Sequence, residues 1–259
     1  MKNSEKYIGI FDSGIGGLTV VRALLDKMPN ENIVYLGDAK HMPYGDKTNE
    51  QIIKYVLDDV KFLNTYNLKA IVIACNTADS VASKTVRESF DIPVYGVIEA
   101  TAKQAAEKTK NNNIGVIATT ATIKTNEYYN QILRYNHYAK VFSQSCPFLT
   151  PLIEEGEFDI GNEKMRYILD DYISPLIEKG IDTLILGCTH YDLLHPIIHD
   201  MFPNLNIVSS SKCIIDKIKK EVEENNNENN EKLYFVTSEK ERFNKVASMF
   251  MPNIEVHQV

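Results

Sequence analysis

The chain has 259 residues, 44% of them hydrophobic and 24% charged, as is typical of a globular protein with one large domain or two modest ones. A formal net charge of −7 argues against nucleic acid or an anionic membrane as the main partner. No apolar stretch approaches the roughly 20 residues of a membrane-spanning helix. The polar N-terminal residues predict no signal peptide, so we expect a cytoplasmic protein.

Hydrophobic periodicity predicts alternating strands and helices from the N-terminus onward. In the first part of the chain, strands are expected at 7–11, 33–36, 70–74 and 93–97, and helices at 18–28, 48–66 and 78–90. Thr48 begins its helix with Gln51 three residues later, which is a capping box. This alternation predicts a parallel sheet with helices on both faces.

The same alternation then begins again. Strands are expected at 114–118, 139–142, 183–186, 206–208, 233–236 and 254–257, and helices at 100–110, 125–134, 163–179, 193–201, 211–224 and 239–250. Gly180 fits the end of its helix, and the asparagine-rich tract at 225–230 is expected to be a solvated loop. Residues 8–14 resemble residues 114–120. These features favour two related α/β halves.

Two cysteines lie in matching settings. Cys75 stands in the segment ACNTA at 74–78 and Cys188 in the segment GCTHY at 187–191, and each follows a short apolar run. In α/β sheets the loops at the carboxyl ends of strands carry the chemistry. Two thiols that face one substrate from opposite sides can remove a proton from one face of a carbon and return it to the other. The pattern therefore predicts racemisation or epimerisation without a cofactor.

The other two cysteines are not predicted to take part in catalysis. Cys146 and Cys213 are expected to be small buried side chains. No cysteine pair has the spacing of a zinc site and no secretory signal favours disulfides, so neither metal nor disulfide is predicted. A free cysteine has a pKa of about 8.5, so it can serve as proton donor or acceptor near neutral pH. A lone histidine is usually structural, but His190 beside Cys188 would favour its thiolate.

Other loops leave two interpretations open. The glycine-rich segment 12–17 either is a strand-to-helix turn or binds an anion such as a carboxylate, and it lacks the spacing of a dinucleotide or Walker motif. The hydroxyls of 119–122 either bind a carboxylate or cap the next helix. Segments 37–38 and 43–45 fit turns, and segment 154–156 fits a surface loop.

Taken together, these segments resemble the cofactor-independent aspartate/glutamate racemase family over nearly the whole chain. The resemblance rests on FDSGIGG at 11–17, YLGD at 35–38, PYG at 43–45, ACNTA at 74–78, GVIAT at 115–119, CP at 146–147, EEG at 154–156 and GCTHY at 187–191. It implies interconversion of L-glutamate and D-glutamate, with D-glutamate supplied for peptidoglycan synthesis. It also implies a homodimer that binds the small-molecule substrate, glutamate, with no cofactor and with neither nucleic acid nor membrane as a partner.

The resemblance also assigns roles to individual residues. It implies that Cys75 and Cys188 transfer the proton. Assistance in catalysis is implied for Asp12, Asp38, Glu154 and His190. Substrate binding is implied for Asp12, Ser13, Tyr44, Gly45, Asn76, Thr77, Thr119, Thr122, Thr189 and His190.

For the fold, the resemblance implies two similar parallel-sheet α/β domains with the active site between them. The first is expected at 1–97 plus 210–259 and the second at 98–209. Three positions depart from the family pattern, at Ala118, Asp192 and the pair 209–210. Asp192 stands where proline is usual, and its charge is expected to raise the pKa of Cys188.

Three alternatives remain. An aspartate racemase or a broad-specificity relative would differ in pocket size rather than in chemistry. A cofactor-free decarboxylase of related fold would need only one cysteine. An amino-acid-binding protein without catalysis would need no paired thiols.

Overall fold

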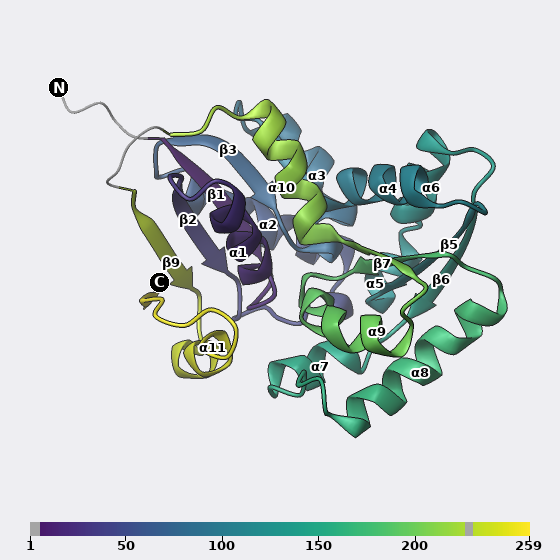
Figure 1. The fold of residues 1–259 in the computed structure, drawn as a ribbon. Coiled ribbons are helices and arrows are strands. Elements are labelled where there is room, and N and C mark those ends of the chain that lie inside the picture. The colour runs from purple at the N-terminus through teal and green to yellow at the C-terminus, as the bar shows by residue number, and fades with distance from the viewer. Residues whose placement is uncertain (1–5, 226–229) are drawn as a thin grey trace.

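Two parallel β-sheets form the framework of the computed structural model, which describes residues 6–225 and 230–259 (Figure 1). The first sheet has the order β10-β9-β2-β1-β3-β4, with β1 Tyr7–Asp12, β2 Asn32–Gly37, β3 Leu68–Ile73, β4 Val94–Gly96, β9 Lys232–Val236 and β10 Val256–Gln258. The second has the order β6-β5-β7-β8, with β5 Asn113–Ala118, β6 Lys140–Ser145, β7 Thr183–Gly187 and β8 Asn206–Ser209. The predicted fold class, two parallel-sheet α/β units, is confirmed.

The two sheets repeat one strand order. The order β2-β1-β3-β4 in the first sheet corresponds to β6-β5-β7-β8 in the second. The central strand β1 pairs with β3, and the equivalent strand β5 pairs with β7. Cys75 follows β3 by two residues and Cys188 follows β7 directly. The two cysteines therefore stand at the carboxyl ends of equivalent strands.

Helices surround both sheets. Their bounds are α1 Leu18–Lys27, α2 Asn49–Leu63, α3 Asn76–Ser89, α4 Val97–Lys108, α5 Thr120–Lys124, α6 Glu127–Tyr135, α7 Leu149–Glu154, α8 Glu163–Glu178, α9 His195–Met201, α10 Ser210–Glu221 and α11 Lys240–Ala247, with 3-10 segments η1 Tyr44–Asp46 and η2 Thr189–Leu194. The capping box of α2 is present: Gln51 N–H donates to Thr48 Oγ1 (3.3 Å), and Thr48 N–H donates to Gln51 Oε1 (3.0 Å). Gly180, just after α8, has a left-handed φ of 75°, as its helix-ending position requires.

One local prediction was wrong, and one helix begins two residues later than expected. Glu154 does not lie in a loop but ends α7, a helix of six residues. A helix this short has too few turns to show a 3.6-residue apolar pattern. The helix expected at 193–201 is preceded by the 3-10 segment η2, whose residues follow Cys188 directly. The tract predicted as a loop at 225–230 lies mostly outside the described residues.

The C-terminal part of the chain returns to the first sheet. Strand β9 pairs with β2, and β10 pairs with β9. Helix α10 packs against α1 and α4, where Figure 1 shows it between the two sheets. The domain bounds 1–97 plus 210–259 and 98–209 stay a prediction. None of the helices in the described part of the chain is long and apolar enough to cross a membrane.

Candidate active site

A cavity of about 350 Å³ opens at the carboxyl ends of strands from both sheets. Its volume suits a small organic ligand. Both Cys75 and Cys188 line it, although each is more than nine-tenths buried. The full lining comprises Ser13, Met42, Pro43, Tyr44, Gly45, Asp46, Cys75, Asn76, Thr77, Thr119, Thr120, Cys146, Pro147, Thr150, Pro151, Glu154, Cys188, Thr189, His190 and Arg242.

Cys75 is held at the N-terminus of α3. Its Sγ accepts a hydrogen bond from the Ala78 N–H (3.5 Å) and lies 3.3 Å from Ser13 Oγ. Burial, with the negative charge of Asp12, raises the pKa of Cys75 to about 12, against the lowering effect of these two hydrogen bonds. In this structure Cys75 is therefore a protonated thiol at neutral pH.

Cys188 has a different environment. Its Sγ lies 3.7 Å from His190 Nδ1 and 3.8 Å from Thr150 Oγ1. On the other side of the imidazole ring, His190 Nε2 is 2.6 Å from Glu154 Oε1. Burial alone would lower the pKa of His190, but hydrogen bonds to Cys188 and Glu154 and their negative charges raise it well above its usual value. A positive imidazolium favours the thiolate of a neighbouring cysteine.

Asp12 connects the loop after β1 to the loop after β7. Its Oδ2 accepts from the Gly14 N–H (3.0 Å) and its Oδ1 from the Thr189 hydroxyl (3.1 Å). Complete burial raises the pKa of Asp12 to about 6, although the charge of His190 and these hydrogen bonds oppose the rise. Asp12 therefore does not line the cavity itself but joins the loop after β1 to the loop that bears Cys188.

Glycine is needed at position 16 because the two loops approach closely there. A Cβ atom at Gly16 would overlap the side chains of Thr189 and His190. The glycine-rich segment 12–17 therefore acts as a close-packed turn. Its predicted role in anion binding stays a prediction.

Polar groups gather beside Cys75, where Asn76, Thr77 and Thr119 line the cavity. Thr122, on α5, does not line it. The hydroxyls of Thr77, Thr119 and Thr122 lie 3.0 Å from one another. Asn76 Oδ1 accepts from the Tyr128 hydroxyl (2.6 Å), whereas its buried Nδ2 has no hydrogen-bond partner among the described residues. Buried donors are nearly always paired. An unpaired amide donor on a residue that lines a cavity points to a ligand with an acceptor oxygen.

Tyr44 lines the cavity but its hydroxyl is engaged elsewhere. It donates to Asp38 Oδ2 (2.7 Å), and Asp38 also accepts from Thr237 Oγ1 (2.8 Å). Asp38 is fully buried and does not line the cavity. The structure thus places Asp38 behind Tyr44 rather than beside a cysteine. Gly45 lies in the cavity wall.

Asp192 does not line the cavity that contains Cys75 and Cys188. Its Oδ2 accepts from the Ser211 N–H (3.2 Å), and it lines a separate cavity beside α1 and α10. Burial raises the pKa of Cys213 to about 12, and the charge of Asp192 adds to this rise. The predicted effect of Asp192 on Cys188 stays a prediction.

Several lining residues were missed by the sequence analysis. Thr150 and Pro151 belong to the short helix α7, and only the nearby CP segment pointed toward it. Arg242 comes from α11, and no motif marked it. Cys146 is buried as expected, yet it also lines the cavity. In residues 6–225 and 230–259, no group of three or more His, Cys, Asp or Glu side chains is arranged to hold a metal ion.

Comparison with known proteins gives concordant matches. The profile of the Asp/Glu/Hydantoin racemase family matches residues 19–218. A glutamate racemase of Sulfurihydrogenibium sp. is 42% identical over 97% of this chain and 96% of its own length. The structure of glutamate racemase isoform RacE1 from Bacillus anthracis has a TM-score of 0.93 at 34% identity, covering 99% of this chain and 98% of that one. A Francisella tularensis glutamate racemase in complex with D-glutamate has a TM-score of 0.89 at 35% identity, with the same coverage.

Proposed function

The chain belongs to the Asp/Glu/Hydantoin racemase family, and we propose that it interconverts L-glutamate and D-glutamate by proton transfer between the substrate Cα and two cysteines, with no cofactor. One observation carries the mechanism. Cys75 and Cys188 end equivalent strands of two sheets and line the same cavity, in unlike electrostatic surroundings. Similarity to glutamate racemases over nearly the whole chain supports glutamate as the substrate.

The reaction needs one thiolate and one thiol at the same time. A positively charged His190 lies 3.7 Å from Cys188 Sγ, while burial and Asp12 raise the pKa of Cys75. The charge of a Cys188 thiolate further raises the pKa of Cys75, so the two sulfurs resist ionising together. In this form Cys188 removes the α-proton from one face and the Cys75 thiol donates a proton to the opposite face. By the family resemblance, Cys188 acts on L-glutamate.

The reverse reaction needs the complementary form. Here Cys75 is the thiolate, stabilised by Ser13 and by the Ala78 N–H at the N-terminus of α3. By the family resemblance, this form acts on D-glutamate. We assign Asp12 to the Cys75 side and the Glu154–His190 pair to the Cys188 side as assisting groups.

Substrate binding in this proposal uses neutral donors together with Asp12 and His190. The amide of Asn76 offers an unpaired donor, and hydroxyls from both loops can bind carboxylate oxygens. The binding set is Asp12, Ser13, Tyr44, Gly45, Asn76, Thr77, Thr119, Thr122, Thr189 and His190, with Asp38 acting through Tyr44. We further propose a cytoplasmic homodimer whose D-glutamate serves peptidoglycan synthesis.

The test is a racemisation assay on dialysed protein treated with a chelator, without pyridoxal phosphate. Circular dichroism of the solution should show each glutamate enantiomer converting to the racemate. In deuterated water the product should carry deuterium at Cα, whereas substrate recovered early should carry little. Faster turnover of aspartate would overturn the substrate, and a need for pyridoxal phosphate would overturn the mechanism.

Cysteine variants test the two-thiol step directly. Cys75→Ala and Cys188→Ala should each abolish racemisation in both directions, because each direction needs a donor and an acceptor. Cys213→Ala is the matched control, since Cys213 is also a buried thiol but does not line the cavity. It should keep activity at a stability cost of about 1 kcal/mol. Near-normal racemisation by either cavity variant would refute the two-thiol mechanism.

A further inference from the structure

Two buried carboxyl groups share one hydroxyl behind the cavity. Tyr44 Oη lies 2.7 Å from Asp38 Oδ2 and 3.2 Å from Asp59 Oδ2. Asp38 directly follows β2, Tyr44 begins η1 and Asp59 lies on α2, so three elements meet at this point. Both carboxyl groups are more than nine-tenths buried.

The hydrogen-bond count at this point requires an additional proton. Burial and the charges of Asp59 and Asp38 raise the pKa of Tyr44 far above its usual range, so its hydroxyl keeps one hydrogen. The shorter distance gives that hydrogen to Asp38, which also accepts from Thr237 Oγ1 (2.8 Å). An ionised Asp59 would then face the lone pairs of the Tyr44 oxygen with a second negative charge nearby. A protonated Asp59 can instead donate to that oxygen.

We propose that Asp59 is a positioning residue that stays protonated at neutral pH and donates a hydrogen bond to the hydroxyl oxygen of Tyr44. Tyr44 is then held between Asp38 and Asp59, with its ring and the following Gly45 in the cavity wall. The effect on substrate binding rests on the proposed function, whereas the protonation of Asp59 does not.

The charges around Asp59 agree with this assignment. Burial and then the charge of Asp38 raise the pKa of Asp59 to about 8, and only a hydrogen bond donated by Tyr44 to an ionised Asp59 opposes the rise. On α2 itself, the neighbouring Asp58 adds a further negative charge. His41 contacts Asp38 through Nδ1 (2.8 Å) and stacks on the ring of Tyr55, with ring centroids 3.8 Å apart.

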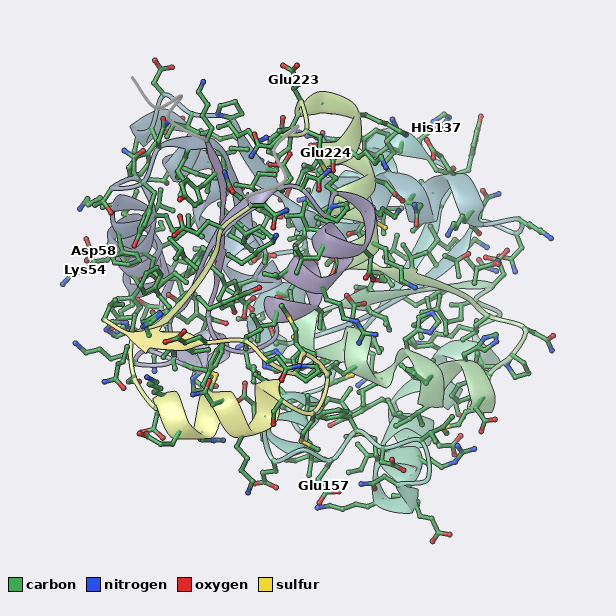
Figure 2. The ribbon with its side chains drawn as sticks, turned by 60° about the vertical axis from the view of Figure 1, so that its left-hand side comes forward. Lys54, Asp58, His137, Glu157, Glu223 and Glu224 are labelled. Carbon is green, nitrogen blue, oxygen red and sulfur yellow. The ribbon has the colours of Figure 1, made fainter. Side chains whose placement is uncertain are left out.

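Substitutions at 59 separate positioning from packing. Asp59→Leu removes the donor and should raise KM for glutamate about three- to tenfold, with a smaller change in kcat. Asp59→Asn retains an N–H donor for the Tyr44 oxygen and should bring KM back to within about twofold of wild type. The matched control is Asp58→Asn, which should leave KM unchanged because Asp58 is 57% exposed and lies at the outer edge of the molecule (Figure 2). Equal KM values for the Leu and Asn variants would overturn the positioning role.

The pH dependence of KM distinguishes the protonation of Asp59 from a purely structural role, because a change in packing alone would not alter that dependence. In wild type, KM should rise above about pH 8 as Asp59 loses its proton. The Asp59→Asn variant should lack this rise, and because all other titrating groups are shared, the difference between the two profiles isolates Asp59. Parallel profiles would overturn the proposal.

A spectroscopic measurement needs no substrate. The infrared difference spectrum between wild type and Asp59→Asn at pH 7 should contain the carbonyl stretch of a protonated carboxylic acid, which disappears above about pH 8. This signal in a protein that does not racemise glutamate would overturn the proposed function and support the protonated Asp59. An active enzyme without the signal would overturn the assignment of Asp59 alone.

Discussion

The protonated carboxyl of Asp59 predicts a pH-dependent loss of stability in the wild-type protein. Asp59 binds its proton with a pKa of about 8 in the folded chain, against 3.8 as the ordinary value. Between these pH values the folded state binds more protons than the unfolded state. The free energy of unfolding therefore falls as pH rises through this window. The stability that the bound proton of Asp59 contributes is fully present below pH 3.8 and fully lost above about pH 8.

The size of the effect follows from the shift. Each pKa unit corresponds to about 1.4 kcal/mol, so wild type at pH 7 has lost about 4 kcal/mol of its low-pH free energy of unfolding through Asp59. Asp59→Asn has no titrating group at this position. The stability of Asp59→Asn relative to wild type should therefore increase by about 4 kcal/mol between pH 4 and pH 7 and level off above pH 8. A pH-independent change caused by the amide itself does not alter this slope.

Urea unfolding at a series of pH values measures this difference. The chain has no tryptophan, so far-UV circular dichroism is the suitable signal. Asp58→Asn is the control, because Asp58 is exposed and pairs with Lys61 on the helix surface (3.0 Å). Its stability should fall with rising pH as in wild type, apart from a small shift to lower pH, because the charge of Asp58 adds to the raised pKa of Asp59. A parallel course for Asp59→Asn as well would refute the claim that Asp59 is protonated in the folded protein.

Three further predictions concern the loops around the cavity. Asp12→Asn should lower turnover in both directions while the thermal midpoint stays nearly unchanged, and a large loss of stability would favour a structural role instead. Glu154→Gln keeps an acceptor for His190 but removes the charge that raises its pKa, so the alkaline limb of the turnover profile should move to lower pH; an unmoved limb would contradict the pairing. Gly16→Ala should cost about 1–3 kcal/mol in urea unfolding and lower turnover, because the new methyl group overlaps Thr189 and His190; an unchanged midpoint would show that the loops can separate.

The strands and the two cysteines were predictable because burial leaves a strong local pattern. Both sides of a parallel sheet are covered, so its strands are continuous apolar runs. The chain changes from apolar to small polar residues where each strand reaches the cavity, at Cys75 and Cys188. The repeated order of the two sheets then follows from the repeated segments.

The side chains that support the cavity were harder to predict. Asp59 occupies one position of an amphipathic helix, where an acidic residue usually faces solvent, and it is buried in the structure, where α2 packs against α3, β1 and β2. Arg242 reaches the cavity because the C-terminal segment returns to the first sheet, which no local pattern encodes. Helix α7 was missed because six residues give no periodicity. For Asp59 and Arg242, the deciding contacts join residues far apart in the chain.

The two sides of the cavity are chemically unequal, yet the proposed reaction is symmetric. L-glutamate and D-glutamate have the same free energy in water, so kcat/KM must be equal in the two directions whatever the protein does. The contrast between His190 beside Cys188 and Asp12 near Cys75 can therefore make the two directions differ in kcat and in KM, but not in kcat/KM. If the resting enzyme carries the thiolate on Cys188, the enantiomer that Cys188 deprotonates meets the reactive form at once. The other enantiomer must wait for a proton to move from Cys75 to Cys188, and a substitution that weakens this preference must change kcat/KM equally in both directions.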